Sequence, residues 1–306
     1  MPPLNLGPHS APVAEDHPGL LRLLAARPGP ALIWHDPDAT SSPRVELSGR
    51  VLENWTVKMI GLFTQEADLQ AGDLVLIDAA PHWKAAAALL AASALGCQVR
   101  LVSGYHRAEA AEPALVLTDA PQLWEHAQAL GEAELAAFSP GLLDASYEDA
   151  VGEPLPSWVI DVSAEVRQQP DQLLIPLPDI GLPDVTPPNV TRPDVTLPEA
   201  ARSDAAPAGR VPATRTGCLV VEDTAPGLTD GAGWAVRRWW DDDLPALMLG
   251  TWAQSGRAVL WRGATTDAAG QPRPQWRRML EEESVPSSGP SSVPSSPSSA
   301  ERPSSR

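Results

Sequence analysis

The residue types that most often carry out acid–base or metal chemistry are few and scattered in this chain. There are six histidines, and no two of them lie three or four positions apart, so a helical pair of metal ligands is absent. No Gly-x-Ser-x-Gly motif occurs and no histidine follows His126, which disfavours a serine hydrolase. The two cysteines, Cys97 and Cys218, are too few for a disulfide framework or a zinc site of cysteine ligands. We expect no metal site.

Polar residues that follow two neighbouring predicted strands form the first candidate ligand site. His82 comes after the strand that ends near Asp78, and it opens a helix. The loop 103–107 follows the next strand and contains Tyr105, His106 and Arg107. Open α/β sheets bind ligands beyond the carboxyl ends of their strands, so these side chains could line one crevice. The alternatives are that His82 only completes a turn at the helix N-terminus and that the loop is merely exposed.

Two further groups of residues, later in the chain, are also candidates. Asp223 ends a predicted strand, where it could bind a cation or a hydroxyl group or lie in a solvated loop. The second group is a corner rich in arginine, tryptophan and aspartate. Arginine and tryptophan are frequent anchors of binding surfaces, so a protein interface is predicted at Arg237, Arg238, Trp239 and Trp240. The alternative is a packing corner whose three aspartates serve the N-terminus of a helix from Leu244.

The elements that must position these residues alternate between strands and helices. Buried-strand patterns are predicted at 31–35, 74–77, 97–102, 114–118 and 134–138, with 44–47 forming a hairpin with the first. Helices are predicted at 20–26, from the Ser48 cap onward, and at 82–95, 121–130 and 157–168. Gly96 suits a left-handed helix terminus. Strand, helix, strand with short loops is a βαβ unit, so the fold class is α/β with a mainly parallel sheet and flanking helices.

The layout of the first region is repeated later in the chain. Strands at 218–223 and 257–261 flank a helix at 244–254, and 234–240 also reads as helical. We therefore expect two α/β halves, 16–169 and 213–280. Between them, residues 170–212 carry a proline-rich five-residue repeat and should form an extended linker. It is either an inserted repeat without a function or a ligand for an SH3-like domain. Residues 1–15 and the Ser/Pro-rich tail 281–306 should be disordered.

Composition narrows the classes of partner. The chain has 306 residues and a formal charge of −17, which argues against nucleic acid because duplex binding needs a cationic surface. The most apolar run, 85–95, is too short to span a bilayer, and the N-terminus lacks the features of a signal peptide. We expect a cytoplasmic protein with no membrane partner, whose partner is a small molecule or another protein.

Residues 44–102 resemble the N-terminal part of adenylate-forming enzymes, the AMP-binding acyl-CoA synthetase superfamily. The matching places are Val45–Ser48, Leu69–Asp73, the Pro81-His82 turn and Gly96. More closely, the chain resembles a family of short actinobacterial proteins of unknown function that is distantly related to those enzymes. The resemblance implies the α/β scaffold of the N-terminal portion of an adenylate-forming enzyme.

The departures from the superfamily pattern bear on activity. Its Ser/Thr/Gly-rich phosphate loop with a lysine is missing; the nearest stretch, 227–233, is acidic and has no lysine. The chain's two lysines, Lys58 and Lys84, both lie in the N-terminal half, so neither matches the superfamily's C-terminal catalytic lysine. Adenylation without such cations loses its main electrostatic support. We expect an inactive relative that uses no cofactor and keeps the scaffold for a ligand or a partner. The alternatives are residual AMP-dependent carboxylate activation, with ATP or AMP bound, and a pure interaction module.

Overall fold

The computed structural model describes residues 13–39, 44–104, 112–141, 144–183, 218–223 and 236–284. The chain divides into two units, Met1–Gly263 and Ala264–Arg306. In the described part of the second unit, one helix, α7 (Pro274–Ser284), buries Trp276 and Met279. The strands and the candidate site residues all belong to the first unit.

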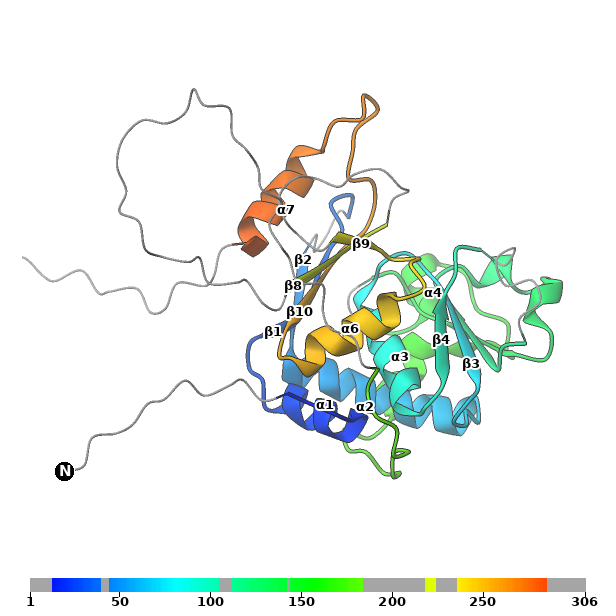
Figure 1. Ribbon diagram of the computed structural model, residues 1–306. Coiled ribbons are helices and arrows are strands. Elements are labelled where there is room, and N and C mark those ends of the chain that lie inside the picture. Colours follow the sequence, from blue (N-terminus) through cyan, green and yellow to red (C-terminus); the bar gives the residue numbers. More distant parts are fainter. Residues whose placement is uncertain are drawn as a thin grey trace, which may run out of the picture. The chain divides into compact units, whose positions relative to one another are not determined.

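The first unit contains two five-stranded sheets (Figure 1). The first sheet has the order β2-β1-β10-β8-β9, and its only antiparallel pair among the described residues is β1 with β2. Its strands are β1 (Pro30–His35), β2 (Arg44–Ser48), β8 (Cys218–Glu222), β9 (Val236–Arg238) and β10 (Arg257–Trp261). The second sheet is parallel throughout, in the order β4-β3-β5-β6-β7. Its strands are β3 (Leu74–Asp78), β4 (Gln98–Leu101), β5 (Leu115–Thr118), β6 (Glu134–Ala137) and β7 (Ile160–Asp161).

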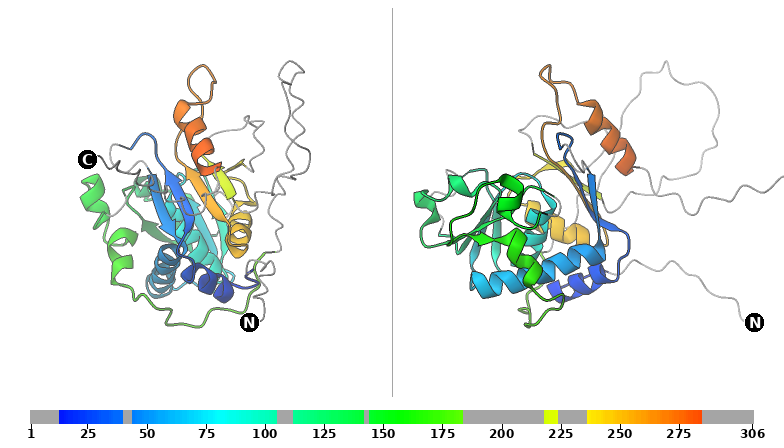
Figure 2. Two further views of the ribbon diagram at one scale, coloured as in Figure 1. Left: turned by 90° about the vertical axis from the view of Figure 1, so that its left-hand side faces the viewer. Right: turned by 180° about the vertical axis from the view of Figure 1, so that it is seen from behind.

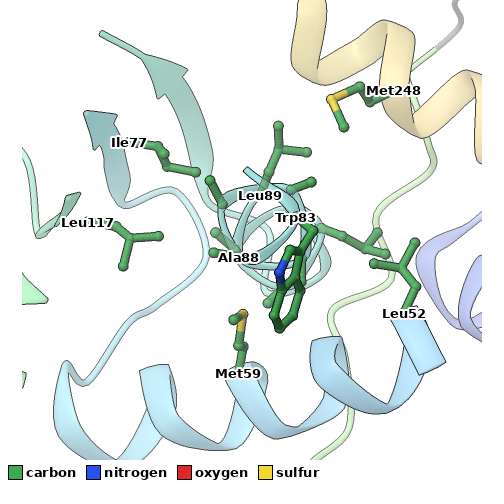
Figure 3. Close-up of a cluster of buried hydrophobic side chains, with 14 of the residues drawn as sticks. Leu52, Met59, Ile77, Trp83, Ala88, Leu89, Leu117 and Met248 are labelled. Carbon is green, nitrogen blue, oxygen red and sulfur yellow. The ribbon is translucent and has the colours of Figure 1, made fainter. Parts of the chain in front are cut away.

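The helix α3 (Trp83–Ala94) lies at the centre of the hydrophobic core, and every one of its residues is buried. Figure 3 shows side chains from other elements around it: Leu52 and Met59 of α2 (Gly49–Glu66), Ile77 of β3, Leu117 of β5 and Met248 of α6 (Leu244–Ala253). In Figure 2 the blue helices α1 (His17–Ala25) and α2 lie side by side at one end of the unit. One core therefore joins both sheets.

Local signals explain the boundaries that the sequence predicted. The Ser48 hydroxyl accepts a hydrogen bond from the Val51 amide (3.3 Å), so it caps α2 as expected. Gly96 ends α3 in the left-handed region, with φ of +82°. The predicted hairpin of β1 and β2 and the βαβ unit of β3, α3 and β4 are confirmed. The fold is α/β with parallel sheets and flanking helices.

Two predicted helices, 121–130 and the described part of 234–240, are wrong, and a third, 157–168, is helical only from Val162 onward. Residues 121–130 form two short 3-10 turns, Pro121–Leu123 and Gln128–Leu130. The predicted helix 157–168 is split into β7, the short helix α5 (Val162–Glu165) and a 3-10 turn at Val166–Gln168, because Asp161 caps α5 and so delays its start. The part of 234–240 that the structure describes begins with β9, which pairs with β8. Tertiary pairing outweighs local propensity there.

The strands of the two predicted halves do not form separate sheets, because β1 and β2 of the first half share a sheet with β8, β9 and β10. The proline-rich segment contains no helix or strand over its described residues 170–183, and residues 184–212 lie outside the described part. Helix α7 continues to Ser284, past the predicted start of the tail at 281. The rest of the tail and residues 1–12 also lie outside the described residues. None of the described helices has the length and apolar character needed to cross a membrane.

Candidate functional site

Charged residues from both sheets meet beyond the carboxyl ends of their strands. We call this group the carboxyl-end cluster; its members are Asp36 after β1, Asp78 at the end of β3, Asp119 after β5, Asp223 after β8 and Arg262 after β10. Arg262 connects the two sheets. Its Nε atom lies 4.0 Å from Asp36 Oδ2, and its Nη2 atom lies 3.6 Å from Asp119 Oδ2.

These two ion-pair distances are longer than an N–H···O hydrogen bond. Within the described ranges, no hydrogen bond from the Arg262 guanidinium accompanies them. The Arg262 side chain keeps 27% of its surface exposed, so it is only partly enclosed by the protein. It therefore has donor capacity that a ligand with oxygen acceptors can fill.

Burial raises the pKa of Asp119, and the neighbouring carboxylates Asp78 and Asp223 add to the increase, while the Arg262 charge opposes it. Burial likewise raises the pKa of Asp223, against a hydrogen bond from the Gly263 amide and the charge of Arg262. A single guanidinium is thus surrounded by several carboxylates. The cluster is electrically negative, which favours uncharged or cationic groups over a triphosphate.

Asp78 is fixed by two hydrogen bonds and is only 8% exposed. Its Oδ1 accepts from the Gly104 amide (2.8 Å), and its Oδ2 accepts from the Trp124 indole (2.7 Å). Asp78 therefore holds the beginning of the loop after β4 and the turn after β5 beside the cluster.

Two more indoles fasten the first sheet to the turn between β3 and α3. Trp34 of β1 donates to the Pro81 carbonyl (2.8 Å), and Trp239, which follows β9, donates to the Ala79 carbonyl (2.7 Å). Both tryptophans are buried. These contacts hold the turn at the carboxyl end of β3 against the first sheet. The position of the cluster is therefore set by hydrogen bonds as well as by apolar packing.

His82 is a buried helix cap. Its Nδ1 accepts from the Lys84 amide (3.0 Å), and its Nε2 donates to the Pro140 carbonyl (3.1 Å). Burial lowers the pKa of His82 well below the usual value, and the charges of Lys84 and Arg262 act in the same direction. The neutral ring uses both nitrogens within the protein. This geometry matches the alternative interpretation, in which His82 completes the turn before α3.

Lys84 is a buried charged residue of the core, although the sequence analysis considered it only as one of the chain's two lysines. It is 2% exposed, and its Nζ lies 2.9 Å from the Ser139 carbonyl oxygen, 2.8 Å from Ser139 Oγ and 3.4 Å from Ser163 Oγ. Burial lowers its pKa to about 8, with Arg167 acting in the same direction and the carboxylates Asp144 and Asp161 opposing. A signal was present in the sequence, because this lysine stands inside an otherwise apolar helix.

The predicted ligand residues are only partly brought together. Tyr105, His106 and Arg107 lie outside the described residues, although Gly104 just before them contacts Asp78. Asp223 joins the cluster, whereas the ring of His82 turns into the core. Sequence reasoning missed Asp36, Asp119 and Arg262, each of which directly follows a strand pattern.

The predicted interface corner consists of the last two residues of β9, Arg237 and Arg238, and the turn that follows at Trp239 and Trp240. Arg237 lies 3.7 Å from Asp243, and Arg238 lies 3.2 Å from Asp241. Trp239 has no exposed surface, so it supports the core and offers nothing to a partner in this conformation. Arg237, Arg238 and Trp240 retain exposed surface. In the described part of the chain, no three His, Cys, Asp or Glu side chains are grouped as metal ligands.

Comparison with known proteins places the fold. No protein-family model and no curated protein matches the sequence. Among solved structures, an acyl-CoA synthetase from Brucella canis superposes with a TM-score of 0.52 and 17% identity over 88% of this chain and 49% of that chain. Acetoacetyl-CoA synthetase from Streptomyces lividans superposes with a TM-score of 0.51 and 13% identity, over 84% of this chain and 39% of that chain.

At these identities the likeness concerns the fold alone. This chain spans less than half the length of either synthetase. The fold is similar to that of the N-terminal domains of adenylate-forming enzymes, which confirms the resemblance drawn from residues 44–102 at the level of architecture.

Proposed function

We propose that this protein is a catalytically inactive relative of AMP-dependent acyl-CoA synthetases that binds a small ligand at the carboxyl-end cluster. The observation that carries the proposal is Arg262. Its half-buried side chain places the guanidinium between the strand ends of two sheets, beyond hydrogen-bond distance of both carboxylates that it faces. Ligands of open α/β sheets bind at this edge.

The proposed loss of adenylation activity is based on which positively charged side chains the chain has and where they lie. The sequence lacks a lysine-bearing phosphate loop, and its two lysines are engaged elsewhere. Lys58 pairs with Asp171 at 2.7 Å, and Lys84 is enclosed by Ser139 and Ser163. Developing charge on a pyrophosphate leaving group would meet carboxylates at the cluster. Under this proposal, ATP is not a substrate and no nucleotide cofactor is required.

A thermal-shift panel tests the proposal. The ligands are AMP, non-hydrolysable acyl-adenylate analogues, and simple carboxylates, alcohols and amines. We expect at least one of them to raise the melting temperature of the wild type in a concentration-dependent way, because binding to the folded state stabilises it. Arg262→Gln should abolish that shift. Arg100→Gln, which changes an exposed arginine on β4, should leave it unchanged.

Carboxylate-dependent exchange of pyrophosphate into ATP separates this proposal from residual activation. We expect no exchange above the level of a mock purification. Exchange that persists after extensive purification and is lost in Arg262→Gln would show that the chain is an enzyme. If no ligand shifts the wild type, the binding proposal is wrong. In that case the corner of Arg237, Arg238 and Trp240, which keeps some exposed surface, makes a protein-interaction module the next candidate.

A further inference from the structure

Residues 169–183, which include the described part of the proline-rich segment, cross the helical layer as a strap. At its beginning, Lys58 of α2 donates to the Gln169 carbonyl and pairs with Asp171. At its end, the Leu182 amide donates to the Glu15 carbonyl (3.0 Å), and Gly181 forms an isolated bridge with Asp16. The left view of Figure 2 shows this green segment running past the blue helices. The strap is therefore held at two separate points.

His17, the first residue of α1, makes the side-chain contact at the end of the strap. Its Nδ1 lies 3.3 Å from the Ile180 carbonyl oxygen. A carbonyl only accepts hydrogen bonds, so Nδ1 carries the proton and Nε2 is the bare nitrogen of the neutral ring. His17 is 4% exposed, and Nε2 is buried without a hydrogen-bond partner.

Protonation of this ring would place an N–H and a positive charge where nothing accepts them. Burying an uncompensated charge is costly, whereas a released ring would be hydrated. We propose that His17 is an acid-sensitive latch whose protonation releases residues 178–182 of the strap from α1. At neutral pH the uncharged ring keeps the strap closed.

The charges around His17 are consistent with this direction. Asp16, on the same helix cap, and the Ile180 carbonyl of the strap both raise the pKa of His17, but burial outweighs them and lowers it below the ordinary 6.5. A released ring titrates near the ordinary value. Between the two values the released state binds more protons, so acidification favours release.

Release of the strap would expose apolar side chains and the backbone groups that now hydrogen-bond to it. Ile180 and Pro178 pack on Gly96, where an added Cβ would lie 2.6 Å from Ile180 Cδ1 and 3.3 Å from Pro178 Cγ. Leu177 and Leu182 are half-buried against the main core. The latch would thus control access to the surface around the end of α3.

Hydrogen exchange tests the latch at the Leu182 amide, with rates corrected for the intrinsic effect of pH. We expect its protection to fall below about pH 6.5, by at most about tenfold per pH unit. Amides of β3 should keep their protection over the same range. In His17→Asn, whose amide can still donate to Ile180 but cannot be protonated, the pH dependence should disappear while protection at pH 7 remains.

His126→Gln is the matched control, because His126 is exposed, and it should behave as wild type. His82 also has a lowered pKa, but its protonation would first affect the Ala86 amide, which donates to the His82 carbonyl (3.0 Å). The proposal is overturned if Leu182 keeps its protection in acid, if His17→Asn retains the same pH dependence, or if Leu182 and Ala86 lose protection together.

Discussion

Replacing Lys84 with methionine should change how stability depends on pH. Lys84 sits in the first turn of α3 with its ammonium group enclosed by Ser139 and Ser163. Methionine has a similar length and no charge. The substitution removes a buried titrating group and leaves the direct contact between Ser139 Oγ and Ser163 Oγ (2.8 Å) in place.

The expected magnitude follows from the pKa. Burial lowers the pKa of Lys84 from 10.5 to about 8. At about 1.4 kcal/mol per pKa unit, the charged lysine costs the folded state about 3 kcal/mol at pH 7 relative to a freely titrating lysine. Between these two pKa values the unfolded chain binds more protons than the folded chain. The contribution of Lys84 to stability therefore rises with pH from about 8 to 10.5.

Urea denaturation at several pH values from 7 to 10.5 measures this effect. We expect the difference in unfolding free energy between wild type and Lys84→Met to move by about 3 kcal/mol in favour of the wild type across this range. Lys58→Met, which removes the other lysine, is the control for the loss of a lysine side chain outside this buried position. Because the chain has only two lysines, NMR titration of the Nζ groups can assign the pKa directly.

Two results would refute the reasoning about Lys84. A difference between wild type and Lys84→Met that does not vary with pH would mean that Lys84 titrates alike in the folded and unfolded states. A measured Lys84 pKa at or above its ordinary value would mean that the serine hydroxyls and nearby carboxylates outweigh burial.

Three further predictions concern the core and the cluster. Trp239→Phe should lower the free energy of unfolding by about 1–3 kcal/mol, because it leaves the Ala79 carbonyl without its indole donor. An unchanged free energy of unfolding in urea denaturation would contradict this. Gly96→Ala should destabilise more than Gly72→Ala, because both glycines have positive φ but only Gly96 faces a close side chain; equal losses in melting temperature would show that the contact is irrelevant. Asp119→Asn should remove a stabilisation that grows as the pH falls, because the raised pKa of Asp119 makes the folded state bind a proton more readily than the unfolded chain; unchanged acid unfolding would contradict it.

The parts of the fold that the sequence predicts are those with short-range causes. The Ser48 cap, Gly96 and the apolar runs of β3 and β5 act within a few residues of where they occur. The pairing of strands that are far apart in the sequence cannot be predicted from such local signals. Nothing local to residues 30–48 indicates that β1 lies beside β10, more than two hundred positions away, because that choice depends on the shape of the whole core.

The candidate site was only partly predictable for the same reason. Asp223 and the general location at the strand ends follow from the α/β rule. Arg262 gains its importance only when β10 inserts between β1 and β8, which brings it to Asp36 and Asp119. Trp239 could not be distinguished from an interface anchor by its residue type, because its burial depends on the pairing of β9 with β8 and on its hydrogen bond to the distant Ala79 carbonyl.

The tryptophan hydrogen bonds bear on what the cluster can do. The indoles of Trp34 and Trp239 donate hydrogen bonds to carbonyls of the β3–α3 turn, and the indole of Trp124 donates to Asp78. These acceptors of the second sheet are therefore already hydrogen-bonded within the protein. A site whose surroundings are already fixed by hydrogen bonds loses little conformational entropy when a ligand binds. Arg262 is the member of the cluster that still has donors to offer. Ligand selection at this edge should therefore depend on a single guanidinium within a rigid, acidic frame, which favours a small ligand with few negative charges over a nucleoside triphosphate.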